Sequence, residues 1–165
     1  MGRRKGGAGE SREIVIPYAR ARLTTDSGDY EFYYPKGIRW SCKRCGACCR
    51  DASNRPRKIL LLVSDVERLE TAGEREFIEK VKGEEPFVAE MRKAGGACIN
   101  LREEGCRVYP NRALLCRMYP FWVEREGRSL EVRVDFRCPG FGHGPEVKEE
   151  YFKDLLTYAL KERGA

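Results

Sequence analysis

The C-terminal part of the chain carries the clearest hydrophobic pattern. Apolar side chains recur every three or four residues between Pro145 and Arg163, at Val147, Tyr151, Phe152, Leu155, Leu156, Ala159 and Leu160. This spacing places them on one face of an amphipathic helix, and Gly164 suits its C-terminal end. We therefore predict a helix here that packs against a hydrophobic core.

Alternating patterns predict strands at both ends of the chain. Within residues 13–41, the segments 14–16, 30–34 and 37–40 are rich in Ile, Tyr, Phe and Trp, which predicts an N-terminal antiparallel sheet. Residues 121–126 and 129–136 alternate around Gly127, with Leu130, Val132, Val134 and Phe136 on one face. This period predicts a hairpin with one buried side.

The middle of the chain predicts shorter elements. Residues 58–63 suit a buried strand, and Ser64 with Glu67 forms a capping-box pattern that predicts a short helix through Glu70. A second helix is predicted over residues 74–81, with Phe77, Ile78 and Val81 facing inward. Residues 98–101 and 106–109 suit the arms of a turn, and a short helix is predicted from Pro110 through Cys116.

Length and composition indicate one soluble domain. The chain has 165 residues, is 41% hydrophobic and 35% charged, and contains no apolar run near the roughly 20 residues of a membrane span. No apolar stretch follows the basic N-terminus, so a secretory signal is not expected. We predict a flexible basic tail at residues 1–12, a single domain at residues 13–165, a cytoplasmic location and no membrane partner.

The cysteines carry the candidate chemistry. Four of the eight fall within eight positions as C-x-x-C-x-x-C-C, and the complete set is Cys42, Cys45, Cys48, Cys49, Cys98, Cys106, Cys116 and Cys138. Two residues between thiols let one turn present both to the same metal centre, as in ferredoxin-type sites. We predict that all eight bind metal. The metal is either an iron-sulfur cluster, with 4Fe-4S as the preferred type, or zinc. The expected fold class is α+β, with small antiparallel strands and short helices packed around this centre and an amphipathic C-terminal helix.

Eight thiols suffice for two sites of four. Following the ferredoxin pattern, in which the remote cysteine precedes a proline, Cys138 before Pro139 joins Cys42, Cys45 and Cys48. The second site then comprises Cys49, Cys98, Cys106 and Cys116. Consecutive side chains diverge, so Cys48 and Cys49 are expected to face different centres, or one of them to be spare.

Positive charge surrounds the cysteine motif. Eight Lys or Arg residues lie between Lys36 and Lys58, against the single acid Asp51. Three interpretations stay open: the cations balance thiolate charge, they bind an anionic partner such as nucleic acid, or they form a solvated face. The lone histidine, His143, suits a solvated loop better than a ligand. Residues flanking Cys116, namely Tyr109, Arg112, Arg117 and Tyr119, are candidates to donate hydrogen bonds to sulfur.

At these cysteines the chain resembles the YkgJ-like cysteine-cluster family, described as a zinc- or iron-chelating domain. The resemblance rests on residues 42–50, 63–69 and 106–121 and on the late Cys138, and it covers about residues 40–140. Ala113 stands where the family usually has proline, and Tyr119 where it usually has phenylalanine. The resemblance implies metal binding by the cysteines. A flagellin lysine methylase is similar in this motif, but the present chain has no glycine-rich nucleotide loop.

Four functions follow from these observations. The leading hypothesis is an iron-sulfur protein in electron transfer, redox sensing or metal handling, with a redox protein as partner. The alternatives are a structural zinc domain that binds nucleic acid or a ribonucleoprotein, a methyltransferase-like enzyme, and a disulfide scaffold. The disulfide scaffold stays a hypothesis because the chain lacks glutamine and is rich in Lys, Arg and Glu, as thermophile proteins are, and intracellular proteins of hyperthermophiles can contain disulfides. No catalytic Ser, Cys-His or paired-carboxylate arrangement is evident.

Overall fold

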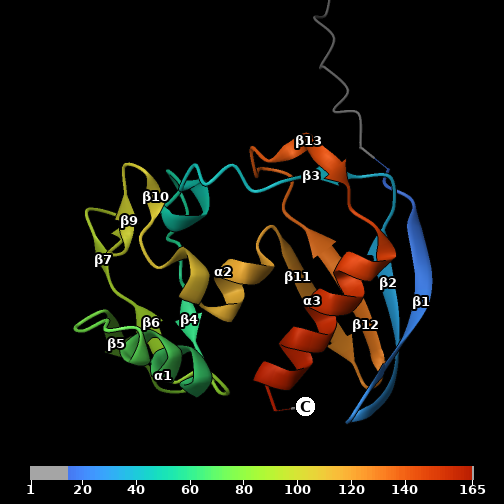
Figure 1. Cartoon of the computed structure of the whole chain (residues 1–165), viewed down its shortest axis with the longest axis horizontal. Coiled ribbons are helices and arrows are strands. Elements are labelled where there is room, and N and C mark those ends of the chain that lie inside the picture. Colours follow the sequence, from blue (N-terminus) through green and yellow to red (C-terminus); the bar gives the residue numbers. More distant parts are fainter. Residues whose placement is uncertain (1–14, 165) are drawn as a thin grey trace, which may run out of the picture.

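The two ends of the chain build one sheet. The structure, a computed structural model, describes residues 15–164. Strands β1 (Tyr18–Thr25), β2 (Gly28–Pro35), β11 (Phe121–Glu126) and β12 (Ser129–Val134) lie in the order β1-β2-β12-β11 (Figure 1). Two antiparallel hairpins, β1-β2 and β11-β12, meet through the parallel pair β2-β12, in which Leu130 lies opposite Phe32.

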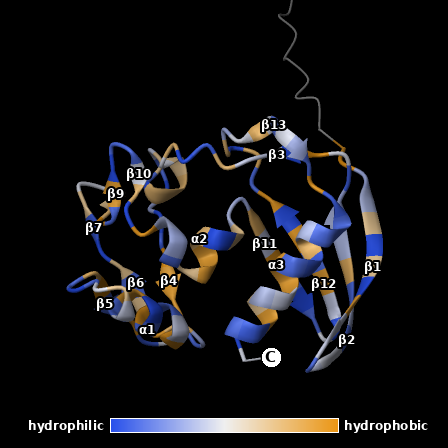
Figure 2. Cartoon of the chain, in the orientation of Figure 1, coloured by the Kyte–Doolittle hydropathy of each residue, from blue (hydrophilic) through white to orange (hydrophobic). Residues whose placement is uncertain are grey.

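Helix α3 (Glu149–Glu162) packs on this sheet and completes its core (Figure 1). Figure 2 shows hydrophobic and hydrophilic positions alternating along α3, as the sequence pattern predicts. Its Phe152 and Leu156 are buried against Phe32, Leu130 and Val132 of the sheet. The predicted hairpin and helix are therefore confirmed, although α3 begins four residues later than predicted.

The segment between β2 and β11 forms the other half of the molecule. It contains β3 (Arg39–Trp40), the 3-10 turns η1 (Ala47–Cys49) and η2 (Tyr109–Asn111), the strands β4 (Leu60–Leu61), β5 (Ile78–Lys80) and β6 (Ala89–Met91), and helices α1 (Val63–Thr71) and α2 (Leu114–Met118). Strands β4, β6 and β5 form a small antiparallel sheet. Two short hairpins follow, β7 (Lys93–Ala94) with β8 (Ala97–Cys98), and β9 (Leu101–Arg102) with β10 (Gly105–Cys106).

Helix α2 lies between the two halves (Figure 1). Its Leu114 and Met118 share a buried cluster with Leu62, next to α1, and with Ala159 of α3. The last strand, β13 (Phe141–Glu146), pairs with β3. After completing the main sheet, the chain thus returns to the half formed between β2 and β11, which is called the cysteine-rich half below because it holds seven of the eight cysteines. This return accounts for the late start of α3, because the residues before it belong to β13.

The α+β class is confirmed, but several predicted elements are wrong. Residues 78–80 form strand β5 rather than part of a helix, because Gly73, with a φ of 91°, and Glu76, with a φ of 53°, interrupt helical geometry and the segment pairs with β6. Phe77 is nevertheless buried, as predicted. The N-cap of α1 is Leu62 rather than Ser64, and the predicted helix from Pro110 is divided into η2 and α2.

Other corrections concern the strands. Val15 and Ile16 precede β1 rather than forming a strand, while Ile14 and the predicted tail at residues 1–12 lie outside the described residues. Phe136 is exposed because β12 ends at Val134. The β2-β12 pair is parallel, whereas only antiparallel strands were predicted.

Within residues 15–164, none of the helices combines the length and the apolar composition that crossing a membrane requires.

Candidate metal centre

All eight cysteines line a single cavity of about 70 Å³ in the cysteine-rich half of the molecule. They come from six segments: the loop after β3, η1, β8, β10, α2 and the turn before β13. All eight are free thiols. The structure thus brings together residues that are up to 96 positions apart in the sequence, from Cys42 to Cys138.

An inner group of five thiols packs in one hydrophobic cluster, comprising Cys48, Cys49, Cys98, Cys106 and Cys116. An isolated antiparallel bridge between Arg50 and Ala97 places the preceding Cys49 beside the following Cys98. The Asp51 N–H donates to the Gly96 carbonyl at 2.8 Å and reinforces this crossing. Long-range pairing, rather than the C-x-x-C spacing, therefore joins these two cysteines.

Buried Asp65 positions Cys116. One carboxylate oxygen accepts from the N–H of Leu62 at the start of α1 (3.1 Å), and the other accepts from the N–H of Leu114 at the start of α2 (3.0 Å). Arg68 pairs with the same carboxylate. Since Cys116 is two residues beyond Leu114, Asp65 ties the start of its helix to α1.

An outer group consists of the exposed Cys42 and Cys45 and the half-buried Cys138. The pairing of Trp40 with Phe141 in β3 and β13 brings the segments of Cys42 and Cys138 together. The Trp40 indole N–H and the Gly140 backbone N–H both donate to the Cys138 sulfur, each at 3.4 Å. Such hydrogen bonds stabilise a thiolate and tune a metal bound to it.

Two glycines permit close approach of the cysteine-bearing segments. A Cβ at Gly140 would lie 2.4 Å from the Ser41 carbonyl oxygen, so a larger residue would push Cys138 away from Cys42. Gly105, directly before Cys106, has a φ of +113°, and a Cβ there would lie 3.1 Å from the Arg44 carbonyl oxygen. The cavity therefore depends on glycine where its walls cross.

The vicinal cysteines Cys48 and Cys49 shift each other's pKa in opposite directions. The neighbouring Cys49 thiol lowers the pKa of Cys48 against the opposing effect of burial, and nearby Arg57 also favours the Cys48 thiolate. The neighbouring Cys48 thiol and burial raise the pKa of Cys49. That Cys48 and Cys49 face different metal centres stays a prediction.

Burial is the main influence on the pKa of the other inner thiols, Cys98, Cys106 and Cys116. It raises the pKa of Cys98 and Cys106, and it raises that of Cys116 to about 12, with the nearby Cys48 adding to the last effect. Arg112 opposes the rise at Cys106. Buried thiolates without a counter-charge are unfavourable, and a bound cation removes this penalty by replacing their protons.

The residues around the thiols differ partly from those predicted. Tyr109 is held between two guanidinium groups, with Arg44 Cζ 4.1 Å and Arg112 Cζ 3.8 Å from its ring centroid. Arg117 donates to the carbonyls of Arg112 and Pro110. In the described part of the chain, none of the four predicted donors bonds to sulfur.

The Cys138 sulfur instead accepts from Trp40 and Gly140, which sequence reasoning missed. Each lies two positions from a cysteine in the sequence, and this proximity was the only signal that could have identified them as donors. His143 lies in β13 rather than in a loop, and its Nε2 is 2.9 Å from Lys43 Nζ at the surface.

Individual sulfur atoms are spread around the cavity wall. In the described range 15–164, no three thiol, imidazole or carboxylate groups meet closely enough to hold one ion. A tetrahedral zinc site with Zn–S bonds of about 2.3 Å needs its sulfurs roughly 3.8 Å apart. Side-chain movement is thus required before these thiols could share one ion.

Fold and site together define a small α+β protein with a cavity formed by eight free thiols and bordered by cations. The chain belongs to the family described as "CxxCxxCC: Putative zinc- or iron-chelating domain", whose model matches residues 41–149. The resemblance inferred from the cysteine motif is therefore confirmed, and the family description supports metal binding.

A relative with no assigned role covers most of the chain. It is "Uncharacterized protein MJ0661" of Methanocaldococcus jannaschii, 30% identical over 141 residues, which span 79% of this chain and 76% of the relative. No solved structure matches the chain.

Proposed function

We propose that the chain is an iron-sulfur protein in which the eight cysteines hold one or two clusters, with 4Fe-4S as the preferred type. The observation that carries this proposal is the convergence of all eight thiols on one cavity. Thiolate-only ligand sets are those of iron-sulfur clusters and of structural zinc. Hydrogen bonds to Cys138 and the cations around the inner group suit a ligated, negatively charged centre.

Two features favour a cluster over a single zinc ion. The sulfurs are too dispersed for three of them to share one ion within the described residues, whereas cluster ligands bind separate irons. The cavity of about 70 Å³ also exceeds the roughly 10–15 Å³ that suffices for one water molecule. A group of several atoms therefore fits the space better than one ion does.

The two thiol groups suggest two sites. The inner site would use Cys49, Cys98, Cys106 and Cys116, and the outer site Cys42, Cys45 and Cys138. Cys48 packs with the inner group, but the ferredoxin-type spacing of Cys42, Cys45 and Cys48 would make it the fourth outer ligand. Because Cys42 and Cys45 are exposed, a partner protein could approach the outer site closely, which suits electron transfer or metal delivery.

Anaerobic purification followed by metal and sulfide analysis tests the cluster. We expect brown protein with broad absorbance near 400 nm and equal amounts of iron and acid-labile sulfide. His143→Ala serves as a control, since His143 is placed outside the ligand set and should leave iron content unchanged. Colourless protein with stoichiometric zinc and no sulfide would contradict the proposal and favour the structural zinc domain.

Redox titration of the same sample tests the proposed role. A reversible one-electron signal in electron paramagnetic resonance is expected for a cluster that transfers electrons. A cluster that is lost on reduction or is transferred intact to an apo-acceptor would instead support metal handling. Both readouts use the protein as purified.

A further inference from the structure

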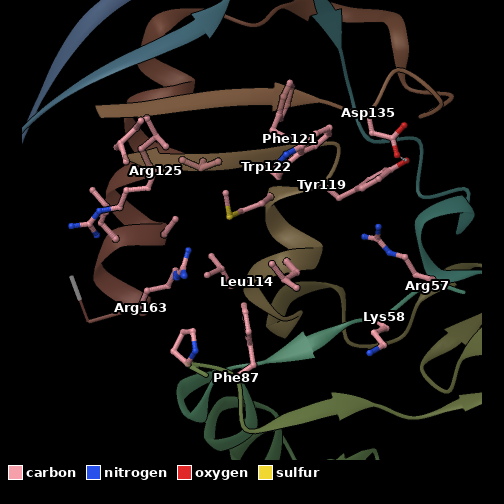
Figure 3. A pocket seen from close by; sticks show the side chains of 18 of the residues that line it. Arg57, Lys58, Phe87, Leu114, Tyr119, Phe121, Trp122, Arg125, Asp135 and Arg163 are labelled. Carbon is pink, nitrogen blue, oxygen red and sulfur yellow. Dashed lines mark hydrogen bonds between the residues drawn. The ribbon is translucent and has the colours of Figure 1, made fainter. Parts of the chain in front are cut away.

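A second cavity, of about 570 Å³, opens beside α2 and is separate from the proposed ligand set because it contains no cysteine (Figure 3). Its walls come from α2, β11, α3 and the segments around residues 57 and 87. Its volume falls within the range of roughly 300–1,000 Å³ that is typical of small-molecule sites. It lies at the junction between the two halves of the molecule, where such sites are common.

The middle of this cavity is apolar. Its lining includes Phe87, Leu114, Met118, Val123, Leu156 and Leu160. In Figure 3 the Leu114 and Phe87 side chains lie between the charged groups at the two ends of the cavity. This surface suits an aliphatic or aromatic group, because burying such a group removes apolar surface from water.

The ends of the cavity are strongly basic. Six cationic residues line it, Arg55, Arg57, Lys58, Arg125, Arg137 and Arg163, against a single acid, Asp135. Arg137 neutralises that acid through bonds of 2.8 Å, and Lys58 has Glu84 at 3.5 Å. Among residues 15–164, no carboxylate pairs with the other four cations. The uncompensated charge favours an anionic ligand.

Arg57 marks the end of the cavity beside the thiols. Its guanidinium lies 4.9 Å from the ring centroid of Tyr119, and Tyr119 lines both the large cavity and the thiol cavity. The Nε of Arg57 is buried and finds no hydrogen-bond partner in the described structure. A buried donor without a partner is costly, and a planar anion such as a carboxylate could accept from it.

We propose that the large cavity binds a small organic anion with an apolar body. Its acidic group accepts hydrogen bonds from Arg57 at the Tyr119 wall, and its apolar part lies on Leu114, Met118 and Leu156. The ligand thereby stands next to the thiol cavity without entering it. This inference does not depend on which metal the thiols hold.

Fluorescence of 8-anilinonaphthalene-1-sulfonate, an anion with an aromatic body, tests the proposal on the folded, metal-loaded protein. Saturable binding at one site is expected, with displacement by octanoate and at least about tenfold weaker displacement by octan-1-ol, a difference of about 1.4 kcal/mol. Octanoate and octan-1-ol share their chain length and differ in charge. Equal displacement by the two, or no saturable binding, would overturn the proposal.

Three variants locate the probe. Arg57→Gln should weaken probe binding at least about tenfold, because it removes a charge-assisted contact. Val123→Phe fills the apolar part from a strand that accommodates aromatic residues, and it should abolish binding while leaving the charges intact. Arg22→Gln, an exposed arginine of β1 outside the cavity, is the matched control and should bind normally.

Circular dichroism and iron content accompany each titration. If Arg57→Gln loses its fold or its metal, Val123→Phe decides the question, because Val123 does not line the thiol cavity. Normal probe binding by a folded Val123→Phe variant would place the probe elsewhere and overturn the proposal. Loss of iron from the wild type would refute only the proposed cluster, since the binding assay reads the other cavity.

Discussion

Asp65 offers the sharpest test of how the cysteine-rich half is held together. Its side chain is fully buried and accepts from the N–H groups of Leu62 and Leu114 while it pairs with Arg68. In Asp65→Ala both N–H groups lose their acceptor, which costs about 1–3 kcal/mol each. Arg68 keeps its ion pair with Glu162, in which Nη1 and Oε2 are 3.2 Å apart, so the variant leaves no unpaired charge at Arg68. We therefore expect a loss of about 3–5 kcal/mol in the free energy of unfolding.

Urea unfolding followed by circular dichroism measures this loss. Small domains have a total stability of about 5–15 kcal/mol, so the shift in midpoint should be large. Asp65→Asn keeps one carbonyl oxygen and should lose less than the alanine variant. The matched control is Asp154→Ala, on the exposed side of α3, with an expected change within about 0.5 kcal/mol. A loss below about 1 kcal/mol for Asp65→Ala would refute the reasoning.

Three further variants probe other parts of the molecule. Cys138→Ser should lower the iron content of anaerobically purified protein, and unchanged metal content would exclude Cys138 from the ligand set. Gly140→Ala should destabilise the protein by about 1–3 kcal/mol in urea, because its Cβ would lie 2.4 Å from the Ser41 carbonyl oxygen. A loss within about 0.5 kcal/mol, the range of ordinary surface substitutions, would contradict this explanation. Phe152→Ala should lower the thermal midpoint through a loss of about 3–5 kcal/mol, and a shift as small as that of Val63→Ala, an exposed position, would argue against a core role for Phe152.

The sequence was informative where periodicity is strong and local. The β11-β12 hairpin and α3 were predicted because their apolar residues repeat over many positions, and a single buried face accounts for each pattern. The helix predicted over residues 74–81 was wrong because Phe77 and Ile78 fit either a helix or a strand over so short a run. Pairing with β6, which no local pattern encodes, decided the outcome.

The cysteines show the same division between local and long-range information. Their spacing predicted a shared ligand set, and all eight indeed line one cavity. It could not predict which thiols would be neighbours, because Cys49 meets Cys98 through the Arg50–Ala97 bridge. Nor could it predict the hydrogen bonds from Trp40 and Gly140 to the Cys138 sulfur, which depend on the pairing of β3 with β13.

The topology explains why Cys138 belongs with cysteines so far away in the sequence. The cysteine-rich half is an excursion between β2 and β11, and the chain leaves it to complete the main sheet with β12. It returns only through the β3-β13 pair, which lies beside both Cys42 and Cys138. Cys138 therefore follows directly on β12, which pairs with β2, and precedes β13. Ligation of a metal by Cys138 would link the two halves across this pair, so metal removal should destabilise the main sheet as well as the cysteine-rich half.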